Sequence, residues 1–130
     1  MSVASFEIEL RGGETDGALM RFRPGETLQG SVRITPLSDL QARHVYVRLL
    51  WHTEGRGDRD QAIITEQDMF QGQLKAGVPV YYSFHFALPQ EPWSYAGHYV
   101  NIVWEVETTV DLSLARDPRA QQPFVLAHEP

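Results

Sequence analysis

The sequence contains no cysteine, and this absence removes several classes of function. Disulfide frameworks, zinc sites built on thiolates and cysteine nucleophiles are all excluded. Positive charge is also scarce, because 11 Lys and Arg residues stand against 17 Asp and Glu residues and the formal net charge is −6. Nucleic acids and anionic lipids are bound through clustered Lys and Arg, so we expect neither as a partner.

Long hydrophobic runs are missing as well. No apolar run approaches the roughly 20 residues of a membrane-spanning helix, and we therefore expect no integral membrane segment. The first residues, MSVASFEIEL, lack the basic and apolar regions of a signal peptide. Together with the absence of cysteine, this favours a cytoplasmic location. The length of 130 residues predicts a single domain over residues 1–130.

Apolar residues rarely recur at the three- and four-residue spacing of an amphipathic helix. They alternate with polar residues instead, as half-buried strands require. The alternating segments are FEIEL (6–10), TLQGSVRIT (27–35), RHVYVRLLWH (43–52), the less regular AIITEQDMF (62–70), VYYSFHFAL (80–88) and the run 100–114, with shorter candidates at 18–22 and 123–127. The pattern predicts an all-β fold, an antiparallel β-sandwich of immunoglobulin-like type with seven to eight strands.

The run from Val100 to Leu114 is the most regular strand of the chain. Its alternation predicts that Trp104 lies in the core and that Glu105 lies in water. Register matters here, because a slip of one residue exchanges the two faces of a strand. Replacing Glu105 with Ala is accordingly expected to change the free energy of unfolding by less than about 0.5 kcal/mol, as at other surface positions.

Two glycines and a proline-rich turn carry further expectations. Gly30, in the middle of an alternating segment, predicts a β-bulge or a close approach of neighbouring backbone. The segment ALPQEPWSYAG (87–97) contains two prolines that interrupt the strand before it and re-aim the chain. Trp93 and Tyr95 are expected to cover the end of the sandwich. Gly97 is expected to adopt a backbone conformation that other residues resist.

Four blocks of the sequence resemble the N-terminal type of arrestin domain. They are FEIEL (6–10), RPGETLQGSVRI (23–34), HVYVRLLW (44–51) and FHFALPQEPWSYAGHYVNIVWEVETTVDL (84–112). The last block is similar to the family's Phe-x-Phe-x-Leu-Pro and Pro-x-Ser-aromatic-x-Gly signature, which precedes a long strand. The resemblance covers residues 6 to about 114 and implies an arrestin-like β-sandwich.

The same resemblance implies a function. It suggests a non-catalytic interaction module, adaptor-like or scaffold-like, that binds protein partners. Full arrestins carry two such domains, whereas this sequence ends soon after the first. We therefore do not expect their interdomain switch to operate within this chain.

The charged segment EGRGDRDQ, from Glu54 to Gln61, follows the strand that resembles the one before the loop that arrestins insert into partners. Loops on a rigid sandwich are where binding residues tend to lie. The candidate partner-binding residues are Glu54, Arg56, Asp58, Arg59 and Asp60. The alternative for this segment is a solvated loop without a partner. Exposed sheet edges are a second route, either to a peptide strand or to a second copy of the chain in a homo-oligomer.

A second hypothesis is a sandwich that binds a small ligand or a carbohydrate. It requires that the outward aromatics Tyr46, Tyr81 and Tyr99 lie together in one concave patch. The arrestin-like hypothesis predicts no deep pocket. Nothing in the sequence resembles a nucleophile elbow or a phosphate-binding loop, so we expect neither an enzyme nor a cofactor.

The histidines raise the question of a metal. His44 and His52 are expected on the outer face of one strand, about 27 Å apart at the rise of an extended chain, which is too far to share an ion. His85 and His98 would be neighbours if their strands pair, and an added acid would then make a zinc site possible. No short ligand motif supports such a site, so surface histidines are favoured.

Overall fold

The computed structural model describes residues 3–57, 59–97, 100–113 and 115–128. These residues form ten strands, and among them no helix is long and apolar enough to cross a membrane. In chain order the strands are β1 (Ala4–Arg11), β2 (Glu14–Asp16), β3 (Leu19–Phe22), β4 (Thr27–Pro36), β5 (Leu40–Gly55), β6 (Gln61–Leu74), β7 (Val80–Ala87), β8 (Tyr95–Ala96), β9 (Val100–Leu112) and β10 (Arg119–Leu126).

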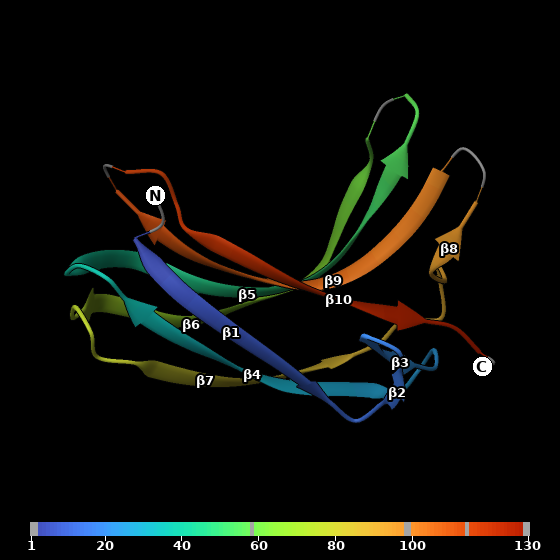
Figure 1. Ribbon diagram of the computed structural model, residues 1–130, viewed down its shortest axis with the longest axis horizontal. Coiled ribbons are helices and arrows are strands. Elements are labelled where there is room, and N and C mark those ends of the chain that lie inside the picture. Colours follow the sequence, from blue (N-terminus) through green and yellow to red (C-terminus); the bar gives the residue numbers. More distant parts are fainter. Residues whose placement is uncertain (1–2, 58, 98–99, 114, 129–130) are drawn as a thin grey trace.

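The strands form two sheets that face each other (Figure 1). The small sheet has the order β1-β4-β7, and the large sheet has the order β2-β3-β10-β9-β5-β6, with β8 added beside β9. Within the described residues, neighbouring strands run antiparallel except β3 and β10, which are parallel over a short stretch. The all-β sandwich predicted from the alternation is therefore confirmed. The two short strands β2 and β8 lie in turn-rich segments where no alternation marks them.

One hydrophobic core fills the space between the sheets. Its largest fully buried side chains are Trp104, Phe22, Phe86 and Phe124. Phe22 and Phe124 meet edge to face with their ring centroids 5.5 Å apart, a favoured geometry for aromatic pairs. The predicted inward position of Trp104 is confirmed, since none of its surface is exposed.

Gly30 lies in the middle of β4, which is the central strand of the small sheet. The register of β4 with β1 and with β7 runs through this position without a shift, so there is no bulge. A Cβ atom here would overlap the carbonyl oxygen of Glu9 and the ring of Phe84. Of the two predicted reasons for this glycine, the structure shows the close approach of neighbours.

The proline-rich segment before β9 is tied to the strands around it. The Ser94 N–H donates to the Leu126 carbonyl at 2.8 Å, and the Leu126 N–H donates to the Ser94 hydroxyl at 2.9 Å. The indole N–H of Trp104 donates to the Pro92 carbonyl at 2.7 Å. These three bonds hold the segment against β9 and the end of β10.

Two expectations for this segment are wrong in detail. Trp93 and Tyr95 do not seal the sandwich, because they remain 47% and 57% exposed. Gly97 is not among the glycines with a positive φ. It is required for lack of space instead, since a Cβ would overlap the ring of Tyr95.

Candidate functional site

Strands β5 and β6 form a hairpin whose end rises away from the small sheet, together with the beginning of β9 (Figure 1). Thr53 and Asp60 close this end. The Thr53 N–H donates to the Asp60 carbonyl at 2.9 Å, and the Asp60 N–H donates to the Thr53 hydroxyl at 2.8 Å. Between them, Gly57 has a φ of +93°, with open space around its Cβ position, so backbone conformation is what favours glycine there. We call residues 53–57 and 59–61 the hairpin tip.

The irregular part of the predicted loop is shorter than the sequence suggested. β5 continues to Gly55, where it still pairs with Val100 of β9, and β6 already begins at Gln61. Four of the five predicted partner-binding residues occupy exposed positions together at the hairpin tip: Glu54, Arg56, Arg59 and Asp60. The fifth, Asp58, lies outside the described residues.

Directly below the tip, His52 lies between two carboxylates on the outer face of the large sheet. Its Nδ1 is 3.1 Å from Oε1 of Glu105 on β9, and its Nε2 is 2.8 Å from Oε2 of Glu54 on β5. His52 is 4% exposed and Glu105 is 9% exposed. We call these three side chains the histidine cluster. It connects the hairpin tip to the centre of the sheet.

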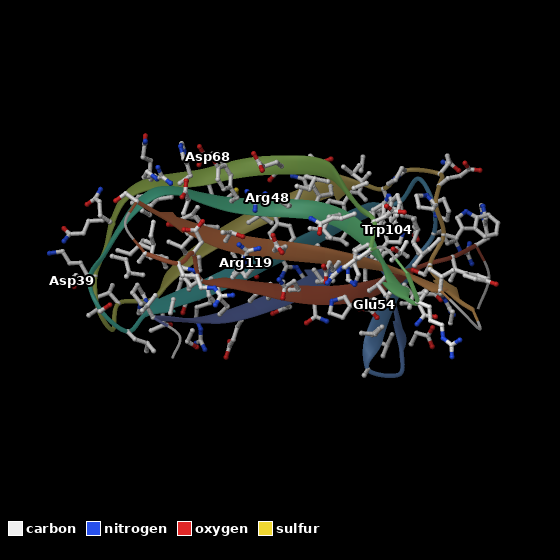
Figure 2. The ribbon with its side chains drawn as sticks, turned by 90° about the horizontal axis from the view of Figure 1, so that it is seen from above. Asp39, Arg48, Glu54, Asp68, Trp104 and Arg119 are labelled. Atoms are coloured by element: carbon white, nitrogen blue, oxygen red, sulfur yellow. The ribbon has the colours of Figure 1, made fainter. Side chains whose placement is uncertain are left out.

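A second polar group, centred on Arg48, continues along the same face (Figure 2). The Arg48 Nε donates to Glu66 of β6 at 2.6 Å, and its Nη1 lies 3.4 Å from Glu107 of β9. Gln121 of β10 donates to the second oxygen of Glu107 at 3.0 Å. These contacts link four neighbouring strands, and charge-assisted bonds of this kind are the stronger ones.

The polar face of β9 was expected to be exposed to solvent, and this expectation is wrong. Glu105, Glu107 and Thr109 are all buried, although they point away from the core. β9 lies between β5 and β10 in the large sheet, so long side chains from both neighbours cover it. Alternation predicts which face a residue occupies, but not whether neighbouring side chains cover that face.

The burial of Glu105 changes its chemistry. Burial raises the pKa of this carboxyl above its ordinary value, and the charges of His52 and Arg59 oppose the rise, whereas that of Glu107 adds to it. Arg59 belongs to the hairpin tip, so the tip and the histidine cluster interact electrostatically. Sequence reasoning missed this link, because the residues that form it are more than 40 positions apart.

The other histidines have separate environments. His44 Nδ1 lies 2.6 Å from Asp68, at the opposite end of β5 from His52. His85 lies on β7, which belongs to the small sheet and does not pair with β9 of the large sheet. His98 lies outside the described residues.

Metal binding finds no support in the described part of the chain. No group of three or more His, Asp or Glu residues there could hold a metal ion. In the histidine cluster the two carboxylates lie at different nitrogens of the His52 ring. The three groups therefore do not converge on one point, as metal ligands must.

The tyrosines do not form the single patch that the ligand-binding hypothesis requires. Tyr46 lies on the outer face of the large sheet, stacked on His44 with ring centroids 5.2 Å apart. Tyr81 lies on β7 in the small sheet and is 65% exposed. The outer faces of the two sheets point in opposite directions, and Tyr99 lies outside the described residues.

Edge strands offer a further surface. β6 is the edge of the large sheet next to the hairpin tip, and β7 is one edge of the small sheet. Gln67 of β6 donates to the His85 carbonyl of β7 at 2.9 Å and so links the two edges. Nearer the tip, β6 carries Ile63 and Ile64 with 51% and 41% of their surface exposed.

Comparison with known proteins identifies the fold. No protein-family model matches the sequence, and no curated protein matches it significantly. Among solved structures, the chain is similar to Spo0M, a sporulation control protein from Bacillus subtilis, with a TM-score of 0.71 and 20% sequence identity. The match covers 98% of this chain and 51% of Spo0M, so the chain spans about half the length of that protein. The fold is arrestin-like, as the sequence blocks suggested.

Proposed function

We propose that this chain, which has an arrestin-like fold, is a non-catalytic module that binds protein partners through its hairpin tip. The observation that supports this proposal is the position of the tip at the raised end of the large sheet, away from the small sheet, where paired strands hold it (Figure 1). The tip carries Glu54, Arg56, Arg59 and Asp60 at exposed positions. Charged side chains held at a defined place on a rigid sheet suit protein recognition.

The anchoring of the tip strengthens the proposal. The paired bonds of Thr53 and Asp60 close its base, and the histidine cluster joins Glu54 to the buried carboxylate of Glu105. A pre-ordered surface loses less conformational entropy on binding than a mobile loop does. We also propose that residues 1–130 act as one domain, because both sheets contribute to one core.

The test compares two variants with matched charge changes. The tip variant replaces Arg56, Asp58, Arg59 and Asp60 with Ser. The control replaces the same numbers of arginines and acids on the outer face of the small sheet: Glu7, Glu9, Arg11 and Arg33, which form exposed pairs. Both variants leave the net charge unchanged, and partners are captured from native lysate with each of them and with the wild-type chain.

The tip variant is expected to lose partners that the control retains. Its Tm is expected to stay nearly unchanged, since exposed side chains at the tip contribute little to packing. If the tip variant retains every partner, the proposal is wrong and the exposed edge of β6 becomes the favoured surface. Equal losses from both variants would indicate binding by general electrostatics rather than by the tip.

A further inference from the structure

The histidine cluster contains two contacts that a single proton cannot satisfy. His52 Nδ1 faces Glu105 at 3.1 Å, and Nε2 faces Glu54 at 2.8 Å. Each contact is a hydrogen bond only if a proton lies in it. A neutral imidazole has one N–H, and an ionised carboxylate only accepts. The observed geometry therefore requires a second proton, held by the imidazole or by one of the carboxyl groups.

When the second proton is lost, one of the two contacts can no longer be a hydrogen bond. The burial of the two carboxylates determines which contact is lost. An imidazole lone pair would then face a carboxylate, which is repulsive. Glu105 is 9% exposed, and leaving a buried charge without a partner is costly. The side chain of Glu54 is 55% exposed and is free to turn into water. The remaining N–H therefore stays at Nδ1, on Glu105, and Glu54 leaves.

We propose that the histidine cluster is a proton-operated switch for the hairpin tip. With two protons it holds Glu54 against the sheet, and with one proton it releases Glu54 to the surface of the tip. Release makes the cluster more negative by one charge, so the released state favours a basic partner. This consequence for binding rests on the proposed function, whereas the switch itself does not.

The charged surroundings of the cluster are consistent with such a switch. Glu107, the next outward residue of β9 after Glu105, raises the pKa of the Glu105 carboxyl, and Arg59 of the tip lowers it. Arg48 is paired with Glu107 at 3.4 Å and partly offsets its charge.

The described residues of the flanking strands place no further charge directly opposite the cluster. Gln61 of β6 lies opposite His52, and Pro123 of β10 lies opposite Glu105. The switch thus depends on His52 and its two carboxylates. Histidine ordinarily changes charge between about pH 5 and pH 8, so this is the range to examine.

The experiment is an NMR titration of the ¹⁵N-labelled full chain from about pH 5 to pH 8. It follows the His52 ring nitrogens and the backbone amides of Glu54, Gly55 and Arg56. We expect the ring and the amides to share one midpoint, with the proton on Nδ1 above it. A Nε2–H ring above the midpoint would overturn the proposal, because Glu54 would then remain bound.

Two variants test the coupling. In Glu54→Gln, the amide group accepts from a protonated Nε2 and donates to an unprotonated one, so the tip amides should no longer shift when His52 titrates. Glu54 is largely exposed, and this variant is expected to fold normally. The control, His44→Gln, changes a histidine that pairs with Asp68 on the same sheet, and it should keep the wild-type midpoint. The switch would be refuted if the backbone amide signals of the tip shifted with pH in Glu54→Gln as they do in the wild-type chain.

The titration uses the free protein, so its outcome is independent of the capture experiment. A tip without partners overturns the proposed function and leaves the switch in place. An uncoupled titration overturns the switch and leaves the proposed function in place. Where both hold, partners lost by the tip variant should be captured more strongly above the midpoint than below it.

Discussion

Replacing Trp104 with Ala should be among the most damaging single changes in this protein. The indole is fully buried between the sheets, and its N–H donates to the Pro92 carbonyl at 2.7 Å. Truncating a buried Trp to Ala typically costs about 3–5 kcal/mol through lost burial and the cavity that remains. A Trp104→Phe variant keeps most of the apolar contact but leaves the Pro92 carbonyl without its donor, which should cost about 1–3 kcal/mol.

Trp93→Ala is the matched control for this prediction. Trp93 lies in the neighbouring turn and also donates its indole N–H to a backbone carbonyl, that of Gln90 at 2.9 Å, but it is 47% exposed. Its loss should cost less than about 1.5 kcal/mol, because little apolar surface is removed from the core. Urea melts of the three variants provide the measurement. Equal costs for Trp104→Ala and Trp93→Ala would show that the assigned face or register of β9 is wrong.

Two further predictions concern Glu105, which was predicted to lie in water and is buried in the structure. Glu105→Ala should lower the free energy of unfolding by about 1–3 kcal/mol, because it leaves the buried His52 Nδ1 without a partner. The control, Glu9→Ala on the exposed face of the small sheet, should change the free energy of unfolding by less than about 0.5 kcal/mol. Equal values for the two variants in urea melts would contradict the buried contact. The pKa of Glu105 is raised in the folded protein by burial, so the folded state binds its proton more tightly than the unfolded state does. This contribution makes stability fall as pH rises from the ordinary glutamate pKa to the raised one, and thermal melts across that window should show a smaller fall for Glu105→Gln.

Among the described residues, local pattern was sufficient to predict every strand except β2 and β8, and to predict which face of β9 points inward. The alternation from Val100 to Leu114 predicted an inward Trp104, and the structure confirms it. The close approach at Gly30 was also readable, because a glycine inside an alternating segment often marks a site where another group comes close to the backbone. The sequence blocks around residues 84–112 indicated the arrestin-like fold without any knowledge of strand order. These inferences succeed because strand periodicity and turn chemistry act over only a few neighbouring residues.

Tertiary structure determined whether the polar face of the large sheet is exposed to solvent or buried. Glu105 and Glu107 have the same alternating pattern as any solvated strand face, yet β5 and β10 cover them. His52 meets Glu105 across 53 positions of the chain. No local pattern encodes such a meeting, because strand order and register are set by the packing of the whole sandwich. The sequence alone therefore determined the alternation of β9, while the fold determined that its outward acids are buried and joined to the hairpin tip.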